Sequence, residues 1–223
     1  MNSKTNIDPH YLVAQLDFNY YYTIYKNVIY MMHNRGYKAL FKPKNRKEYV
    51  SMCLGYLAEM KTAHDFLDKL INVFEHKENN KKCMVYYHIL NIKFKKADMD
   101  YILNYKQDSN YDKLILITKE KATSIVNSTA QMLQDEIQLF VENEFILNII
   151  EHAFVPKHTR LNESEKKELM EYYNTDQKHF PAIYSDDPIV KYYDWKNGDM
   201  IKIERTGIDG IKEIYYRVVC ERV

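Results

Sequence analysis

Apolar residues from Leu12 to Met31 recur at intervals of three and four, which is the spacing of one face of an α-helix. Asp8-Pro9 precedes this series and reads as a helix start, because Asp caps free amides and Pro fits the first turn. Gly36 is expected to end the helix in the left-handed conformation. Similar spacing predicts a second helical region from about Lys47 to Phe74, followed by a solvated, charged loop over residues 75–82.

The pattern changes after residue 82, where short apolar runs begin to alternate with helical segments. The predicted elements are a strand at 83–90, a helix at 95–105, a strand at 114–117, a helix at 120–133 and a strand at 137–141. Strands that alternate with helices favour an α/β layer with a mixed sheet. We therefore expect residues 1–148 to form one α/β domain that opens with long helices.

The last third of the chain, residues 149–223, is predicted to be a small α+β module. Asn162 is placed to cap a helix, and Glu165 stands three residues later, where it can complete a capping box. Alternating apolar residues at 200–205 and 212–220 predict two strands joined as a hairpin. Modules of this size seldom hold a large core unaided. We therefore expect a partner surface to complete the burial of this module.

Charge and hydropathy exclude several classes of protein. The net charge is +1, so any contact with DNA must come from a local patch and not from the charge of the whole chain. No apolar run approaches the length that spans a bilayer, and the first residues lack the apolar core of a secretion signal. These features favour an intracellular protein.

The cysteines and histidines do not show the spacing of a metal site. Cys53, Cys83 and Cys220 are odd in number and lack a C-x-x-C pair, which favours free thiols in a reducing compartment. The spacing of His152, His158 and His179 does not fit a zinc site either. We therefore expect no metal and no other cofactor.

The most informative segment is Val155-Pro156-Lys157-His158, which follows His152 and runs directly into the capped helix. Neither composition nor periodicity accounts for it. Further short motifs follow in order, namely Phe180-Pro181-Ala182-Ile183, Asp187-Pro188, Tyr192-Tyr193, Gly198 with Lys202-Ile203, and Tyr216-Arg217-Val218. This series resembles the signature of the small subunit shared by eukaryotic RNA polymerases I, II and III, the fifth subunit, which has a counterpart in the archaeal RNA polymerase. Arg35-Gly36-Tyr37 resembles a motif at the same place in that family.

The resemblance implies a non-catalytic subunit of a multisubunit DNA-directed RNA polymerase, not an enzyme in itself. It implies a restriction-endonuclease-like N-terminal domain that forms part of the jaw around downstream double-stranded DNA, with weak, sequence-independent contacts. It also implies a C-terminal module that docks on the largest subunit, next to other polymerase subunits. The implied location is the nucleus. The divergent N-terminal half and the AT-rich coding bias favour a large-DNA-virus version, which would lie in the viral factory and the virion, or a fast-evolving eukaryote.

The motif and the predicted strand pair supply the candidate partner-binding residues. Pro156 fixes the backbone, so the turn is expected to present Lys157 and His158 as a rigid pair of donors. An equally open alternative is a structural turn whose histidines satisfy local carbonyls, beside a solvated sheet face. The candidates are His152, Val155, Pro156, Lys157, His158, Arg205, Tyr216 and Arg217.

A second set of candidates lies between the strand at 114–117 and the helix that follows it. A helix N-terminus with lysine and hydroxyl side chains is suited to phosphate, so these residues are candidates for contact with the DNA backbone. Ordinary helix capping and a solvated lysine pair explain the same residues. The candidates are Lys119, Lys121, Thr123 and Ser124.

Two other functions stay open. The first is a free-standing Mg²⁺-dependent nuclease or DNA-processing protein, whose chemistry needs an acidic residue and a Glu-x-Lys on neighbouring strands. Glu75-His-Lys77 has this spacing, but we expect it in a loop. The sequence offers no other catalytic constellation that we recognise. The second is an interaction adaptor that keeps the C-terminal module outside a polymerase.

Overall fold

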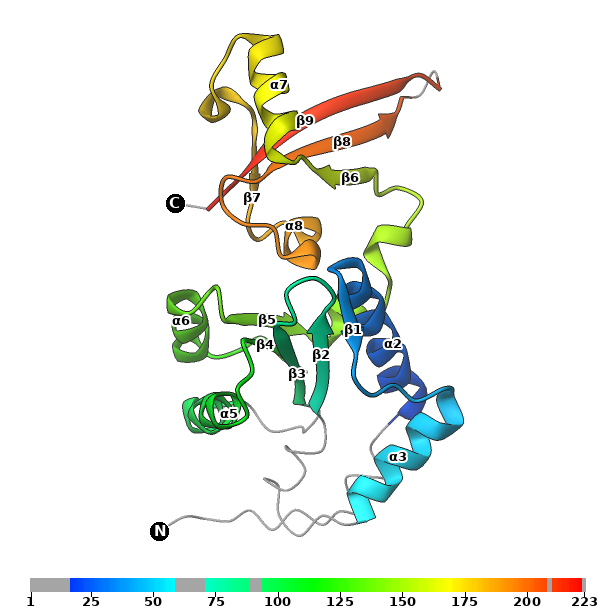
Figure 1. Cartoon of the computed structure of the whole chain (residues 1–223). Helices are drawn as coiled ribbons and strands as arrows, with labels where there is room; N and C mark the ends of the chain where they lie inside the picture. Colours follow the sequence, from blue (N-terminus) through cyan, green and yellow to red (C-terminus); the bar gives the residue numbers. More distant parts are fainter. Residues whose placement is uncertain (1–16, 59–70, 89–93, 208–209, 222–223) are drawn as a thin grey trace. The chain divides into compact units, whose positions relative to one another are not determined.

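The computed structural model describes residues 17–58, 71–88, 94–207 and 210–221 (Figure 1). The chain divides into two compact units, residues 1–147 and 148–223. The N-terminal unit is built on a mixed five-stranded sheet, and the C-terminal unit on a mixed four-stranded sheet. The chain is therefore a mixed α/β protein with helices packed against two separate sheets.

In the N-terminal unit, the strands lie side by side in the order in which they occur in the sequence. β1 to β3 pair antiparallel, whereas β3, β4 and β5 pair parallel. The strands are β1 (Tyr37–Ala39), β2 (Ile71–His76), β3 (Lys82–His88), β4 (Lys113–Thr118) and β5 (Ile137–Val141). The parallel half requires crossovers, which α5 (Lys96–Asp108) and α6 (Ser124–Met132) supply.

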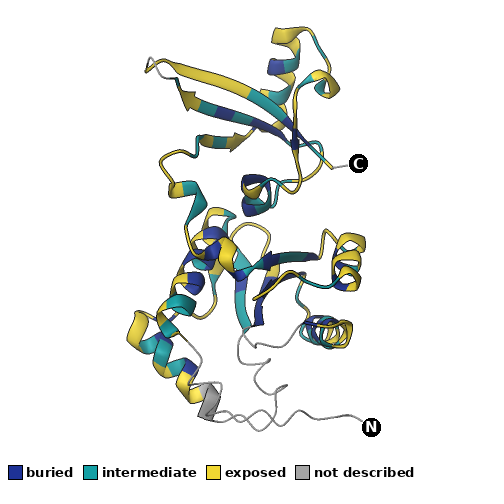
Figure 2. Ribbon diagram, turned by 180° about the vertical axis from the view of Figure 1, so that it is seen from behind, coloured by how far each residue is buried: buried dark blue, intermediate teal, exposed yellow. Residues whose placement is uncertain are grey.

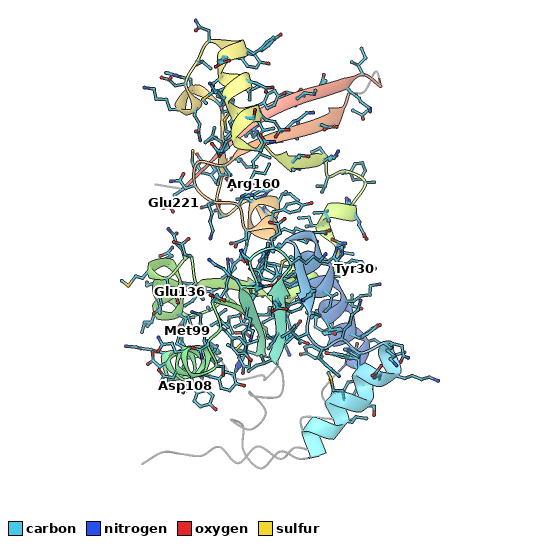
Figure 3. All side chains as sticks on the ribbon, in the orientation of Figure 1. Tyr30, Met99, Asp108, Glu136, Arg160 and Glu221 are labelled. Atoms are coloured by element: carbon cyan, nitrogen blue, oxygen red, sulfur yellow. The ribbon has the colours of Figure 1, made fainter. Side chains whose placement is uncertain are left out.

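One face of this sheet packs against α5 and α6. Its core includes Met84 and Tyr86 of β3, with Met99 of α5 and Val126 of α6. At the edge of this core, Lys106 Nζ donates to Glu136 Oε2 at 2.5 Å; Figure 3 labels Met99 and Glu136. The crossover helices are therefore held by apolar burial together with a part-buried ion pair.

The alternate residues of β3 face the other way and are buried as well. α2 (Phe18–Asn34) and α3 (Arg46–Ala58) contribute to this second layer. The rings of Tyr25 on α2 and Tyr49 on α3 lie 4.9 Å apart between centroids, and both interact electrostatically with Tyr87 of β3. Burial raises the pKa of all three phenols, so they stay protonated.

Two sequence predictions in this unit are wrong. The predicted helix from Lys47 to Phe74 includes residues 71–74, which belong to β2. The predicted solvated loop over 75–82 contains the end of β2, a short turn and the first residue of β3. Antiparallel pairing explains both, because β2 and β3 form a hairpin in which Glu75 lies opposite Lys82. The middle of the predicted helix, at 59–70, lies outside the described residues.

The predicted continuous helix from Asp8-Pro9 to Gly36 is also wrong at Asp17, whose backbone is extended and whose side chain caps α2 by accepting from the amide of Asn19 at 2.9 Å. Other predictions for this unit are confirmed. The helix ends before Gly36, whose φ of +87° favours glycine. The strands at 114–117 and 137–141 and the helix at 95–105 are present as β4, β5 and α5. The predicted start at Asp8-Pro9 lies outside the described residues.

The C-terminal unit has the strand order β6-β8-β9-β7. β6 and β9 both pair antiparallel with β8, whereas β7 pairs parallel with β9. The elements are β6 (Lys157–Arg160), α7 (Glu163–Tyr173), β7 (Ala182–Tyr184), α8 (Pro188–Tyr193), β8 (Met200–Thr206) and β9 (Lys212–Cys220). Two 3₁₀ turns, η2 (Ile149–Glu151) and η3 (Gln177–His179), lie in the described connections of this unit, and η1 (Glu142–Phe145) follows β5 in the N-terminal unit.

Both faces of this sheet are covered at one end. Ile201, Ile203 and Val219 pack with Val190 of α8 on one face, which agrees with the alternation predicted for residues 200–205. Met200 and Val218 pack with Leu161 and with Leu169 of α7 on the other. Alternation along β8 and β9 sends neighbouring residues to opposite faces, so one pair of strands supplies both small cores.

The predicted cap of α7 is confirmed. Asn162 Oδ1 accepts from the Glu165 amide at 3.0 Å, and Glu165 Oε2 accepts from the Asn162 amide at 2.7 Å. This reciprocal pair satisfies two donors at the helix start. The helix ends at Asn174, whose φ is +47°.

Candidate functional site

The Val155–His158 segment leads into strand β6. The backbone turns at residues 152–155, where the Val155 amide donates to the His152 carbonyl at 2.9 Å, and β6 begins at Lys157. His158 Nδ1 lies 2.7 Å from the Pro156 carbonyl, and His152 Nδ1 accepts from the Phe154 amide at 3.4 Å. Both histidines therefore make local backbone contacts, as the structural-turn alternative expects.

The expected pairing of Lys157 with His158 as joint donors is wrong. The two are consecutive residues of β6, so their side chains point to opposite faces of the sheet. Lys157 is exposed, whereas His158 is half-buried. The motif therefore contributes one side chain to each face.

The strand register sorts the candidates. His158 lies opposite Ile203, which lies opposite Tyr215, while Ile201 lies opposite Arg217. One face of the sheet therefore carries four of these side chains, and we call it the histidine face. Its members are His158, Arg205, Tyr215 and Arg217. Lys157 and Tyr216 lie on the opposite face.

Electrostatic effects within the histidine face agree with this grouping. Burial lowers the pKa of His158, and the charges of Arg205 and Arg217 lower it further. The Pro156 carbonyl and Asp187 raise this pKa, but by less. His158 is therefore neutral near pH 7, so it contributes a hydrogen-bonding ring and no charge. The positive charge that this face offers a partner therefore comes from its arginines, and Glu213, opposite Arg205 in the register, adds a carboxylate.

Two of the candidates on this face are engaged within the unit. Arg217 Nη1 donates to the Ala182 carbonyl at 2.8 Å, which ties β9 to β7. Arg205 lies with its guanidinium carbon 5.3 Å from the centre of the Tyr215 ring, and Tyr215 donates its hydroxyl to Glu213 at 2.6 Å. Tyr215 was not among the sequence candidates. Tyr216 was selected through the Tyr216-Arg217-Val218 motif, whereas strand alternation would have placed Tyr215 on the same face as Arg217.

The opposite face has its own charges. Lys202 Nζ lies 3.3 Å from Glu204 Oε1 and Lys157 Nζ lies 4.0 Å from it, and together they lower the pKa of Glu204. Tyr216 is half-buried, with its ring 6.4 Å from that of Tyr173 on α7. This face therefore carries a carboxylate, Glu204, that interacts with two lysines.

Arg160 extends the cationic surface of β6. It lies on the histidine-face side, opposite Ile201 in the register, and its guanidinium is 3.5 Å from Asp199 Oδ2 (Figure 3 labels Arg160). Phe154, which lies within the motif's turn, is 91% exposed. These two residues were also missed. Phe154 is notable because a phenyl ring is seldom left so exposed without a partner.

The DNA-binding candidates of the N-terminal unit are brought together in one segment. Lys119 and Lys121 are exposed in the connection after β4, and Thr123 and Ser124 open α6. Thr118 Oγ1 donates to the Glu120 carbonyl at 2.7 Å and so turns the chain at the strand end. The side chain of Thr123 makes no capping bond, which leaves its hydroxyl unused by the helix.

A carboxylate that the sequence reading missed lies beside this segment. Glu142 directly follows β5, is buried, and interacts with Lys119 and with the hydroxyl of Tyr20. Burial raises the pKa of Glu142, whereas Lys119 and Tyr20 lower it. Its position could have been inferred, because the carboxyl ends of parallel β4 and β5 lie together. A phosphate near Lys119 would compete with Glu142.

The described residues contain no group of three or more His, Cys, Asp or Glu side chains arranged to hold a metal ion. Our expectation that Glu75 lies in a loop is wrong, since it is on β2. Its neighbours there are basic: Lys38 Nζ is 2.9 Å from its carboxylate, and Lys82 lies opposite in the register. The cysteines at 53, 83 and 220 are all free. No helix in the described ranges has the length and hydropathy to cross a membrane.

Comparison with known proteins identifies the same family that the motifs resemble. Residues 147–219 match the family model "RNA polymerase Rpb5, C-terminal domain". Subunit 5B of DNA-directed RNA polymerases IV and V from Arabidopsis thaliana is 23% identical over 207 residues, covering 92% of each chain. Subunit RPABC1 of DNA-directed RNA polymerases I, II and III from Caenorhabditis briggsae is 27% identical over 203 residues, covering 88% of this chain and 93% of the relative.

A third relative, subunit rpabc1 of RNA polymerases I, II and III from Dictyostelium discoideum, is 29% identical over 116 residues, which are 50% of this chain and 59% of the relative. The first two alignments extend through both units, and the family model lies almost entirely within the C-terminal unit. The C-terminal unit therefore matches the Rpb5 C-terminal domain, and the chain as a whole is similar to Rpb5-like common subunits of RNA polymerases.

Proposed function

We propose that the chain is a non-catalytic subunit of a multisubunit DNA-directed RNA polymerase. The observation that carries the proposal is the family match over residues 147–219. Similarity to polymerase subunits over 92% of the chain supports it for both units. In this proposal the nucleotide and Mg²⁺ chemistry belongs to the large subunits, and the chain works inside the cell where that polymerase works, in the nucleus or in a viral factory.

The C-terminal unit docks on the largest subunit in this proposal. Its surface supports such a role, because apolar residues stay exposed after both faces of the sheet have been packed. Phe154, Tyr172, Tyr173, Ile211 and Ile214 are each at least half exposed. Exposed aromatic and aliphatic groups next to arginines are the composition of protein interfaces.

The N-terminal unit forms part of the jaw beside downstream duplex, on a restriction-endonuclease-like fold. The exposed Lys119 and Lys121 at the start of α6 support this role, since a helix N-terminus with nearby lysines suits a backbone phosphate. Few cations take part, so the contact is weak, independent of base sequence and sensitive to salt.

Affinity purification of the tagged full-length chain from its own cells tests the proposal. We expect the two largest polymerase subunits to co-purify in stoichiometric amounts. Their absence, with the tagged chain intact and soluble, would contradict the proposal. A Mg²⁺-dependent plasmid cleavage assay with the purified chain is the matched test for the nuclease alternative, and we expect no cleavage above that of a mock purification.

The Pro156→Ala/His158→Ala double variant tests the role of the motif within the same experiment. We expect weaker incorporation into the polymerase, because Pro156 sets the entry into β6 and His158 bonds to the Pro156 carbonyl. Ser164→Ala, at an exposed position in the first turn of α7, is the control. Equal co-purification of both variants would count against a role of the motif in docking.

A further inference from the structure

The β8–β9 hairpin extends beyond the two outer strands of its sheet (Figure 1). β7 pairs only with residues 218–220 of β9, whereas β8 pairs with residues 212–218. On its β7 side, β9 therefore has no described neighbouring strand over residues 212–216. An open strand edge of this kind presents unpaired backbone donors and acceptors.

The hydrogen bonds at the ends of β9 show which backbone groups point to this open side. The Val218 amide donates to the Pro181 carbonyl on the β7 side at 2.9 Å. The Ile211 carbonyl accepts from the Gly207 amide on the β8 side at 2.8 Å. Because the direction of backbone groups alternates along a strand, even-numbered residues of β9 face outward. The residues that present free backbone groups at the edge are Lys212, Ile214 and Tyr216.

The side chains along this edge protect it only at its outer end. Soluble proteins usually guard an open edge with a short strand, a charged side chain such as lysine, a proline or a bulge, and here the charged residues are Lys212 and Glu213. Here the open stretch has Ile214, 50% exposed, at its centre, with Ile211 (62%) and Tyr215 (43%) on either side of it in the sequence. Figure 2 shows the outer half of β9 in the exposed colour. A surface of this kind suits an added strand with apolar side chains.

The charges around the edge indicate what else that strand carries. Residues 202–206 and 212–217 hold four cationic and two carboxylate side chains. Both carboxylates are already engaged, Glu204 with Lys202 and Glu213 with the Tyr215 hydroxyl. In the described ranges, no carboxylate lies within ion-pair distance of Arg205 or Lys212. The edge is therefore complementary to an acidic segment.

We propose that residues 212–216 of β9 pair with an extended segment of the largest polymerase subunit, which adds a strand to the sheet. This inference rests on the proposed function and specifies the mode of docking. The main-chain bonds hold the segment, and its apolar side chains contact Ile214 and Tyr216. Its acidic side chains pair with Lys212 and Arg205.

Photo-crosslinking from the edge identifies the occupant. A photoreactive amino acid replaces Ile214 in the tagged full-length chain, and the polymerase is isolated from irradiated cells. We expect an adduct to the largest subunit, mapped by mass spectrometry to a segment that contains both apolar and Asp or Glu residues. The control position is Lys167, an exposed residue on α7. An adduct to another subunit or to a second copy of the chain, or no adduct in a polymerase that co-purifies normally, overturns strand addition while the proposed function stands. Loss of co-purification by the wild-type chain overturns both.

The Ile214→Pro variant tests the backbone bonds directly. Proline removes an outward N–H, while the β8–β9 ladder is made by the groups of residues 213 and 215. We expect about a tenfold loss of the co-purified largest subunit, and none for Ile214→Val, which keeps the N–H. Circular dichroism and thermal unfolding establish that the variant is folded.

A charge variant leaves the backbone unchanged and covers the case in which proline unfolds the hairpin. We expect Arg205→Glu/Lys212→Glu to lower co-purification by a similar factor of about ten. The control is Lys166→Glu/Lys167→Glu on α7, which changes the net charge by the same amount. Full retention of the largest subunit by either folded edge variant overturns the proposal.

Discussion

The side-chain amide of Asn27 donates a 2.7 Å hydrogen bond to the backbone carbonyl of Phe145, 118 positions later in the chain. Both residues are buried. The bond joins α2 to the 3₁₀ turn η1, which directly follows β5. Asn27 thereby fixes the opening helix to the last strand of the N-terminal unit.

We expect Asn27→Ala to lower the free energy of unfolding of this unit by about 1–3 kcal/mol, because it leaves a buried carbonyl without its partner. Chemical denaturation followed by far-UV circular dichroism measures the change. Asn127→Ala is the control, since it removes an amide-to-carbonyl bond at an exposed position. Equal effects of the two substitutions would show that burial of the Asn27 hydrogen bond does not increase its contribution to the free energy of unfolding.

We expect Gly36→Ala to destabilise the N-terminal unit by roughly 1–2 kcal/mol. Gly36 has a φ of +87°, and a Cβ there would lie 2.9 Å from Nε2 of His76 on β2. Gly55→Ala is the matched control, because Gly55 lies within α3 and a Cβ there meets nothing within 4 Å. That change should raise stability by up to about 1 kcal/mol. Thermal unfolding of both variants checks the opposite signs.

We expect Asn162→Ala to destabilise the C-terminal unit by about 1 kcal/mol, because the Glu165 amide loses its acceptor at the start of α7. Asn162→Asp keeps an acceptor and should be nearly neutral. Urea denaturation of the full-length chain, followed by hydrogen exchange of amides in α7, separates this unit from the other. A loss of similar size in both variants would contradict the capping account.

We expect the stability of the C-terminal unit to fall as the pH drops through 6.5. The pKa of His158 is lower in the folded chain than the ordinary value of 6.5, chiefly because the ring is half-buried. In that range the unfolded chain binds the proton and the folded chain does not, so acid favours unfolding until the pH passes below the folded pKa.

The His158→Asn variant isolates this effect, because the asparagine amide keeps a donor for the Pro156 carbonyl and does not titrate. The measurement is the difference in melting temperature between pH 7.5 and 5.5, compared between variant and wild type. We expect a smaller difference in the variant. The same difference in both proteins would mean that other groups produce the pH dependence.

We expect Lys119→Glu/Lys121→Glu to leave incorporation into the polymerase intact and to weaken its hold on downstream duplex. The salt dependence of DNA retention should become shallower, by up to about 0.9 in slope for each phosphate that the chain no longer neutralises. Lys77→Glu/Lys81→Glu, on the turn between β2 and β3, is the control of equal charge. An identical salt response in both double variants would remove the predicted patch from the jaw.

Local chemistry in the sequence was the most reliable guide to the fold. The cap at Asn162 and the stop at Gly36 depend on a few neighbouring residues, and both are present in the structure. The strand β2 was misassigned because Ile71 and Phe74 continue a helical spacing. Its strand conformation depends on pairing with β3 and β1, which a local pattern does not contain.

The candidate sites show the same difference between what neighbouring residues determine and what pairing between distant strands determines. The sequence placed Lys119 and Ser124 in one segment correctly, because they are close in the chain. It missed Glu142, which comes near Lys119 only through the parallel pairing of β4 with β5. It also grouped Lys157 with His158, which a strand separates, and missed Tyr215, which the register places across Ile203 from His158.

The pairing of β7 has a consequence for synthesis on the ribosome. β7 has no partner other than β9 among the described strands, and β9 is the last strand of its unit to be translated. In a nascent chain that has emerged only as far as β8, β6 and β8 can therefore pair. The backbone of β7 has no strand to pair with until β9 emerges. The five strands of the described sheet in the N-terminal unit are complete by residue 141, so this unit can fold before the C-terminal unit has been translated.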